Sequence, residues 1–400
     1  MKAKNKQRRN ILEDEEKYQR ELNIRKIVIT SIIAIFLIAI IVIFSLYIAE
    51  ESFRKWVDVN VLRKDIASEN VASIDLNVDK NNQIFCYNKY ICILNEKNLK
   101  LYNQSGENIT DISVDINTAL FSSNDKYLAI AEKNGQEFCV ITDKSYSWRQ
   151  KVDGEILQIY INKNGYVALV TTDTTYKSII TVYDQTGKQL MRNFLSTTRV
   201  IDVTISNDNK NVAFAEMDTS GTLIKSSVKI ISIEKAQTKS DESIIYSKEA
   251  STSKMILKVQ YQDKNDLVCV YDDGISIVKD GKETEVLSKE DGITFMSGNL
   301  NNNIAYIKEE QVGAFESTSK LSIVNPLNGQ TSTYNFDEIA KEMYTNGNII
   351  GVNIGTEMYF IGTNGMLIKK YTSNQEITNV MITKGLAIII YKDRIEIVNL

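Results

Sequence analysis

Histidine is absent from this sequence of 400 residues. Its absence excludes Ser-His-Asp and Cys-His catalysis, histidine-ligated haem and most zinc sites, because each of these needs an imidazole ring. The four cysteines contain no CxxC pair. We find no other catalytic signature, so we expect that the protein is not an enzyme and that it holds neither a cofactor nor a metal ion.

The cysteines also leave one structural alternative open. Cys139 and Cys269 lie within apolar patterns typical of strands, which predicts buried thiols. Cys86 and Cys92 flank residues 88–90. A three-residue loop there would place the two thiols opposite each other, where they could form a disulfide, whereas a two-residue loop would pair Cys86 with Ile91.

The larger part of the chain has more acidic than basic residues. Residues 50–400 contain 38 basic and 46 acidic residues, a formal charge of −8. This balance disfavours nucleic acid and anionic lipid surfaces as partners of this part.

Residues 27–49 lack any charge, glycine or proline. As a helix this run would be about 35 Å long, against a hydrocarbon core of roughly 30 Å, so it predicts a transmembrane helix. A cleaved signal peptide is the alternative. The apolar run is longer than the usual core of about 7–15 residues, and the exit at residues 47–50 has no small residue at the −3 position. Both observations favour an uncleaved membrane anchor.

The distribution of lysine and arginine predicts the orientation of this anchor. Residues 1–26 contain nine of them, and the twenty residues after the apolar run contain four. By the positive-inside rule the N-terminus is cytoplasmic, and the large domain lies outside the cell membrane. The tail is predicted to be helical from Asn10, and residues 50–70 form a juxtamembrane linker.

Residues 71–400 consist of a repeated strand pattern. Eight similar apolar segments begin near Tyr90, Tyr127, Tyr166, Asn211, Asp266, Asn303, Asn348 and Leu386. Each is followed by a second apolar segment, and Asn, Asp and Gly mark the turns between strands. Repeats of about 40–45 residues with four strands each are typical of a β-propeller. We therefore predict an all-β, eight-bladed β-propeller, with seven blades as the alternative.

The ends of this pattern predict how the ring closes. The last repeat stops at Leu400 after three strands, so residues 71–77 are expected to supply its outer strand. The longest irregular stretch, residues 234–254, is expected to hold an outer strand over 243–247 inside a flexible insert.

The anchor, the repeats and stretches such as YICILNEKNLKLYNQSGENI (residues 90–109) resemble an uncharacterised family of single-pass, membrane-anchored β-propeller proteins from low-GC Gram-positive bacteria. The resemblance implies location and fold but no activity. The blades also resemble WD40-like and quinoprotein-like propellers. The Trp-Asp dipeptide is absent, however, and two tryptophans are too few for the tryptophan girdle of quinoprotein blades.

Two kinds of loop are candidates for a site. The turns at 79–82, 124–126 and 207–209 contain Asn and Asp, which could suggest calcium, but these residues also suit left-handed turns, and we favour that structural interpretation. The loops 172–178, 217–226 and 309–319 are longer than their counterparts and are expected on one face of the ring. Tolerated insertions are the alternative. The predicted partner-binding residues in these loops are Tyr176, Met217, Leu223, Val312 and Phe315.

These patterns favour a non-enzymatic binding or scaffold protein that holds a protein or a cell-wall polymer at the outer face of the membrane. One alternative is a propeller enzyme that acts on cell-envelope glycan. It would need two carboxylates converging in the central channel, for which Asp75 and Asp202 are candidates. A transmembrane sensor that signals through the anchor to the tail is the other alternative.

Overall fold

The structure, a computed structural model, describes residues 27–29, 31–48, 53, 57, 71–76, 82–95, 97–124, 126–251, 254–262, 264–289, 292–312 and 316–400. The predicted tail helix, nearly all of the predicted linker over 50–70, and Phe315 lie outside these residues. The chain divides into two compact units, Met1–Asp65 and Ile66–Leu400.

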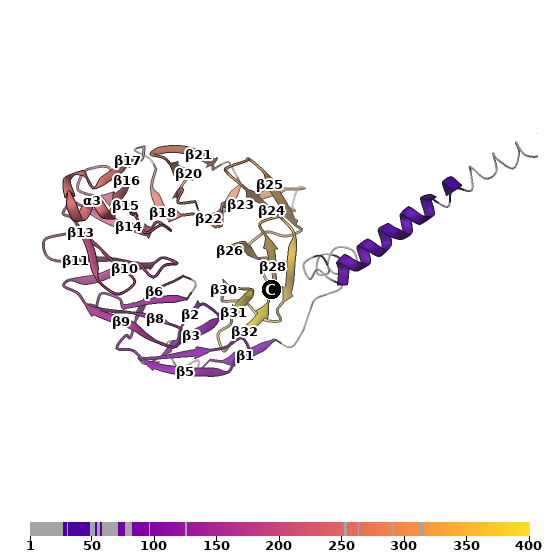
Figure 1. The fold of residues 1–400 in the computed structure, drawn as a ribbon, viewed down its shortest axis with the longest axis horizontal. Helices are drawn as coiled ribbons and strands as arrows, with labels where there is room; N and C mark the ends of the chain where they lie inside the picture. The colour runs from indigo at the N-terminus through magenta and orange to yellow at the C-terminus, as the bar shows by residue number, and fades with distance from the viewer. Residues whose placement is uncertain are drawn as a thin grey trace, which may run out of the picture. The chain divides into compact units, whose positions relative to one another are not determined.

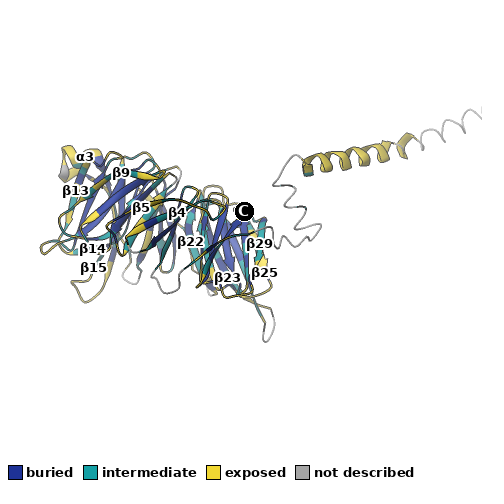
Figure 2. Cartoon of the chain, turned by 90° about the horizontal axis from the view of Figure 1, so that it is seen from below, coloured by how far each residue is buried: buried dark blue, intermediate teal, exposed yellow. Residues whose placement is uncertain are grey.

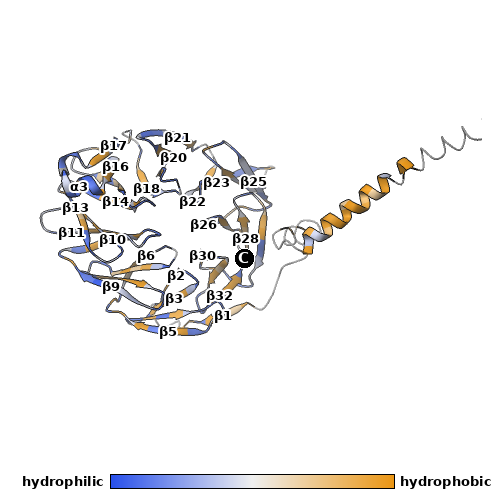
Figure 3. Cartoon of the chain, viewed as in Figure 1, coloured by the Kyte–Doolittle hydropathy of each residue, from blue (hydrophilic) through white to orange (hydrophobic). Residues whose placement is uncertain are grey.

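The first unit contains one long helix, Ile27–Ile48, with a mean hydropathy of 3.4. Apolar residues lie on all its sides, and none of its most apolar window is buried (Figures 2 and 3). By length and composition it is able to cross a membrane. The structure thus confirms the predicted apolar helix.

The second unit is an all-β propeller of eight four-stranded antiparallel sheets arranged in a ring (Figure 1). The prediction of eight blades is confirmed, and the alternative of seven is wrong. We call the strands of each blade A to D from the central channel outward. The first four blades are β2 (Gln83–Tyr87), β3 (Tyr90–Asn95), β4 (Asn98–Tyr102) and β5 (Asn108–Ser113); β6 (Ala119–Asn124), β7 (Tyr127–Glu132), β8 (Glu137–Thr142) and β9 (Ser145–Lys151); β10 (Glu155–Ile161), β11 (Val167–Thr172), β12 (Ser178–Tyr183) and β13 (Gln189–Leu195); and β14 (Thr198–Ile205), β15 (Asn211–Asp218), β16 (Lys225–Ser232) and β17 (Ile244–Glu249).

Blades 5 to 8 complete the ring. They are β18 (Ile256–Tyr261), β19 (Leu267–Tyr271), β20 (Gly274–Lys279) and β21 (Lys282–Ser288); β22 (Ile293–Leu300), β23 (Asn303–Gln311), β24 (Ser317–Val324) and β25 (Thr331–Phe336); β26 (Glu342–Asn346), β27 (Ile349–Asn353), β28 (Glu357–Gly362) and β29 (Leu367–Thr372); and β30 (Asn379–Thr383), β31 (Leu386–Ile390), β32 (Arg394–Asn399) and β1 (Ala72–Asp75).

Blade 8 closes the ring with both ends of the domain. Its A, B and C strands come from the C-terminus, whereas its D strand is β1, which pairs antiparallel with β32 from Ala72↔Ile397 to Asp75↔Arg394. This confirms the predicted closure by residues 71–77, of which 72–75 form the strand.

Burial follows the position of each strand in its blade. All six residues of the C strand β12 are buried, whereas burial alternates along the D strand β9. The inner strands are covered by neighbouring blades on both faces, and the outer strands reach the rim (Figure 2). Continuous apolar runs therefore mark the B and C strands, and alternation marks the D strands.

The turn noted at 207–209 is an A–B turn. Residues 79–81 and Asp125 of the other two noted turns lie outside the described residues, and 79–82 connects β1 of blade 8 to β2 of blade 1 rather than an A strand to a B strand. Asn88 and Asn209 have φ angles of 52° and 62°, in the left-handed region that asparagine tolerates. The turn at Asn88 has two residues, so Cys86 pairs with Ile91, and all four cysteines are free thiols. The alternative of a Cys86–Cys92 disulfide is therefore wrong.

The stretch 234–254 is more ordered than the sequence suggested. It contains the short helix α3 (Ile233–Thr238) and the 3-10 turn η1 (Ser240–Glu242) before β17. Ser232 caps α3, because its side chain accepts a hydrogen bond from the backbone N–H of Lys235. The expected outer strand is present but runs from Ile244 to Glu249.

Candidate partner-binding face

The loops between B and C strands emerge on one side of the ring, which we call the BC face. In blades 3, 4 and 6 these loops span 173–177, 219–224 and 312–316. In the other blades they have two to four residues, as at 272–273 in blade 5. The prediction that these three loops are longer than their counterparts is confirmed. The ends of β15 and β23 that lead into two of them lie on the same side of the ring (Figure 2).

In blades 4 and 6 the long loops are the ends of extended hairpins. β15 and β16 pair from Asn211↔Ser232 to Asp218↔Lys225, and β23 and β24 pair over eight residues as well. Leu223 and Ile224 at the first tip are 59% and 50% exposed, and Val312 at the second is 66% exposed. These ladders hold aliphatic side chains above the ring, in contact with solvent.

A buried carboxylate stabilises the base of the blade 4 hairpin. Glu216 in β15 is buried, and one of its oxygens lies 2.6 Å from the ammonium nitrogen of Lys229 in β16. The hydroxyls of Ser227 and Thr198 donate to the same carboxylate at 3.0 and 2.8 Å. Because Thr198 belongs to the A strand β14, this network joins three strands of the blade.

The blade 3 loop is more compact than the two hairpins. The carboxylate of Asp173 accepts hydrogen bonds from the N–H groups of Thr175 and Tyr176, both at 2.7 Å. The ring of Tyr176 packs against that of Phe194 with centroids 4.9 Å apart. Tyr176 is half-buried, and Phe194 is the exposed member of the pair.

The structure therefore separates the five predicted site residues. Leu223 and Val312 are exposed at hairpin tips. Tyr176 and Met217 are partly buried, and Met217 is a ladder residue of β15 paired with Arg199 and Ser226. Phe315 lies outside the described residues.

A second feature of the same blades was not predicted. The A strands β10, β14, β18 and β22 of blades 3 to 6 each have a register shift at the start of the strand. Within the described residues, the A–B ladders of blades 1, 2, 7 and 8 have none. Such bulges re-aim side chains and often lie near functional sites. The residues skipped by the pairing are Leu157, Ile201, Leu257 and Thr294.

In blades 3 and 4, the side chain of the residue that follows the bulge forms a hydrogen bond with the next blade. The side-chain amide of Gln158 donates to the carbonyl oxygen of Ile201 at 2.8 Å. The carboxylate of Asp202 accepts from the N–H of Val259 at 2.9 Å. Burial raises the pKa of Asp202 above its ordinary value. In blade 5 the bulge leaves Leu257 48% exposed at the start of β18.

Exposed apolar side chains concentrate on this part of the molecule. Outside the N-terminal helix, twelve large apolar residues are exposed among the described residues, and six of them lie on the BC side of blades 3 to 6. We call these six the apolar arc. The arc consists of Phe194, Leu223, Ile224, Leu257, Val312 and Ile339.

The two carboxylates considered for catalysis are not brought together. Asp75 lies in β1, the D strand of blade 8, and pairs across the ladder with Arg394. Asp202 lies in β14, the A strand of blade 4. The two side chains therefore belong to different blades, one on an outermost strand and the other on an innermost strand.

The architecture can be compared with known proteins at this point. The sequence of residues 63–400 matches a protein family described as a family of unknown function (DUF5711). The chain belongs to this family. No curated protein matches the sequence. Membership accounts for the whole propeller and assigns it no activity.

Solved structures similar to this chain have low sequence identity to it. BamB from Moraxella catarrhalis is 12% identical, with 82% of this chain and 96% of that chain covered and a TM-score of 0.50. The Pan2 WD40 domain of Neurospora crassa is 9% identical, with 70% and 87% covered and a TM-score of 0.41. Hydrazine synthase of Kuenenia stuttgartiensis is also 9% identical, with 78% and 92% covered and a TM-score of 0.40. The likeness to BamB supports the fold alone.

Proposed function

We propose that this DUF5711 protein is a non-enzymatic, membrane-anchored scaffold that binds a protein partner outside the cytoplasm through the BC face of blades 3 to 6. The observation that carries the proposal is the apolar arc: among the described residues outside the helix, half of the exposed large apolar side chains lie on one face of four adjacent blades. Burying them against a partner removes apolar surface from water.

The chemistry of the arc favours a protein over a cell-wall polymer. Five of its six side chains are aliphatic, and Phe194 is its only aromatic member. Aliphatic side chains on projecting hairpins suit the apolar core of a protein interface, with a polar rim around it. A sugar polymer instead favours planar aromatic rings and many hydrogen-bonding groups.

The anchor and its orientation belong to the same proposal. The helix Ile27–Ile48 is apolar on all sides, and lysine and arginine are more frequent before it than after it. The propeller is then held at the outer face of the cell membrane by a single span. Protease added to intact spheroplasts is expected to degrade the propeller, and full protection there would overturn the orientation.

A crosslinking experiment in intact cells tests the binding face. A photoreactive amino acid at Leu223 of the full chain is expected to give specific crosslinks to a protein. The same group at Leu327, which is exposed on the C–D turn of blade 6 on the opposite face, serves as the matched control. Equal crosslinking at both positions, or crosslinks to glycan alone, would contradict the proposal.

Substitutions on the two faces complete the test. Replacing Leu223 and Ile224 together by Ser is expected to weaken partner recovery at least tenfold, because a few apolar anchors usually carry most of the binding energy. Leu327→Ser is expected to leave recovery unchanged. Both variants change solvent-exposed side chains, so their melting temperatures should equal that of the parent.

A further inference from the structure

The ring closes with a strand that is held differently from all others in the described propeller. Each of the other D strands follows its own C strand in the chain, through a short turn or, in blade 4, through α3 and η1, whereas β1 pairs with β32 more than 300 residues later in the chain. Its ladder of four residue pairs is the shortest among the described strands. Removing β1 therefore breaks one short ladder and no hairpin.

Only one side chain of β1 is buried in the propeller. Ile74 is buried among the isoleucines of β3 and β32, and the other three residues of the strand are partly or fully exposed. The backbone of Ser73 also lies against Gly106, where an added Cβ would meet the Ser73 carbonyl oxygen at 3.0 Å. β1 is thus seated between blade 8 and the C–D turn of blade 1.

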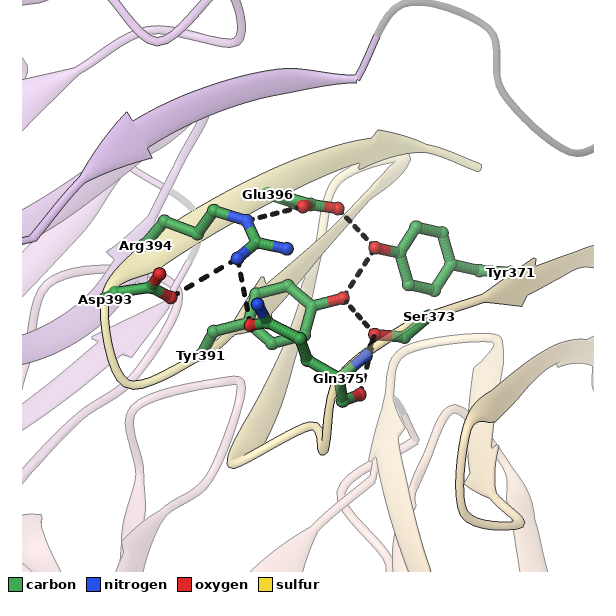
Figure 4. A network of polar contacts seen from close by, with 7 residues as sticks. All are labelled: Tyr371, Ser373, Gln375, Tyr391, Asp393, Arg394 and Glu396. Atoms are coloured by element: carbon green, nitrogen blue, oxygen red, sulfur yellow. Dashed lines mark hydrogen bonds and ion pairs between the residues drawn. The ribbon is translucent and has the colours of Figure 1, made fainter.

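The neighbour of β1 is, in contrast, firmly attached to blade 7 (Figure 4). Arg394 in β32 donates to the side-chain carbonyl of Gln375, in the connection from blade 7, at 3.0 Å, and to Glu396 at 2.8 Å. Glu396 in turn accepts from the hydroxyl of Tyr371 in β29. The hydroxyl of Tyr391 lies 2.6 Å from that of Tyr371. None of these contacts involves β1, so we expect them to keep β32 in place after β1 is released.

The direction of β1 determines how it would be loaded. Ala72, where the upstream chain enters, pairs with Ile397 near the end of β32, on the side of the ring opposite to the BC face. A pull between the upstream chain and a partner on the BC face therefore acts along the strand. β1 is the first strand of the propeller along the chain, so we expect tension on the upstream chain to load these four residue pairs before any other strand pairing.

From these observations we propose that β1 is a force-sensitive clasp: tension on the chain upstream of it removes β1 from blade 8 before any other strand leaves the propeller. The load itself rests on the proposed function, since the anchor supplies one point of attachment and the bound partner the other. Release of β1 leaves the edge of β32 unpaired. It also exposes the apolar side chains that Ile74 covers at the junction of blades 8 and 1.

Single-molecule force measurement on the full chain in detergent tests this clasp. Handles are attached at Ala67→Cys, upstream of β1, and at Gly221→Cys, which is exposed at the tip of the blade 4 hairpin. Release of residues 71–82 is expected as the first step, with an extension of at most about 40 Å, whereas unravelling a whole blade of about forty residues gives about 130 Å or more. A first step of blade length would overturn the proposal.

Matched variants assign that step to β1. Ile74→Ala is expected to lower the force of the first step. Ile112→Ala, which removes the only buried side chain of the hairpin-linked D strand β5, is expected to leave it unchanged. Handles at Gly221→Cys and Asn328→Cys load blades 4 to 6 without β1 and should give no short first step. An unchanged force in Ile74→Ala, or a short step with the second handle pair, would contradict the clasp. Neither readout involves partner binding, so failure of the proposed binding face is distinguishable.

Discussion

At the scale of single residues, the most consequential group is the carboxylate of Glu216 below the blade 4 hairpin. Removing one partner of a buried ion pair leaves the other without compensation. Glu216→Ala is therefore expected to lower the free energy of unfolding by about 3 kcal/mol, because Lys229 and two hydroxyls lose their acceptor. Urea denaturation monitored by fluorescence measures the change.

An exposed pair in the same blade is the control for this prediction. Glu249 and Lys225 lie 3.3 Å apart with 57% and 58% of their side chains exposed. Exposed ion pairs contribute little to the free energy of unfolding. Glu249→Ala is therefore expected to change it by less than about 1 kcal/mol. Equal losses in the two variants would mean that Glu216 has no special role in the hairpin.

The thiols give a residue-scale prediction about pH. Burial raises the pKa of Cys86 and of Cys139 to about 12, from 9.0. The unfolded chain loses these protons near pH 9 while the folded protein keeps them, so their contribution to stability is complete below pH 9 and falls as the pH rises toward 12. Each buried thiol should add a slope of about 1.4 kcal/mol per pH unit in this range.

Denaturation curves between pH 7.5 and 11 check this dependence. The double variant Cys86→Ala with Cys139→Ala is expected to lose part of the alkaline slope. Cys92, Cys269 and the buried tyrosines, whose pKa values burial also raises, should account for the rest. At pH 7.5 the three buried thiols, Cys92, Cys139 and Cys269, should not react with a thiol reagent in the folded parent, whereas Cys86 is only partly buried. Rapid modification of the three buried thiols in the folded state would contradict their burial.

At the scale of elements, β1 is the strand on which ring closure depends. Deleting residues 71–76 leaves β32 as an unpaired edge, and exposed edges pair with other chains. The truncated protein is expected to aggregate and to melt at a lower temperature than the parent. Light scattering and calorimetry measure both effects, and an unchanged melting curve would show that β1 is not needed.

The hairpins illustrate how far an element can be read from sequence. The tight turns in most blades and the longer loops in blades 3, 4 and 6 were apparent, because Asp-Gly and Asn-Gly pairs mark short turns. That β15, β16, β23 and β24 continue into the loops was not apparent, since Met217 and Glu309 belong to ladders that the sequence assigned to loops. Long-range pairing decides where such a strand ends.

At the scale of the whole molecule, the blades are joined by a belt of hydrogen bonds from their A strands. Within the described residues, a hydrogen bond that involves a side chain joins neighbouring blades at each of the eight junctions. Between blades 2 and 1, for example, the Ser123 hydroxyl donates to the carbonyl of Cys86, and between blades 8 and 1 the Thr383 hydroxyl donates to the carbonyl of Asn88. Asn299 joins three blades, because it accepts from Gln260 and donates to the carbonyl of Thr345. We expect these hydrogen bonds to couple the blades into one cooperative unit.

Asn299→Ala tests that coupling. The change leaves the Thr345 carbonyl and the Gln260 amide without partners, so the free energy of unfolding is expected to fall by about 2 kcal/mol. Asn328→Ala, in an exposed turn, should change it by less than about 0.5 kcal/mol. Calorimetry that gave equal melting temperatures for both variants would contradict a role for the belt.

The sequence by itself determined the apolar helix, the all-β class, the eight repeats and the closing strand. Each of these is written in local patterns: a long uncharged run, β-branched segments at regular spacing, turn residues, and a last repeat one strand short. The origin in low-GC Gram-positive bacteria and the orientation in the membrane stay predictions from composition and charge.

Only the tertiary structure decided which residues meet. The bulges of blades 3 to 6, the gathering of Phe194, Leu257 and Ile339 with the hairpin tips, and the separation of Asp75 from Asp202 depend on register and on the packing of one blade against the next. A one-residue shift in register moves a side chain to the other face of its strand. Such shifts leave almost no trace in a local pattern. At Ile201, for example, the carbonyl of the extra residue accepts a hydrogen bond from Gln158 of the neighbouring blade, some forty residues earlier in the chain.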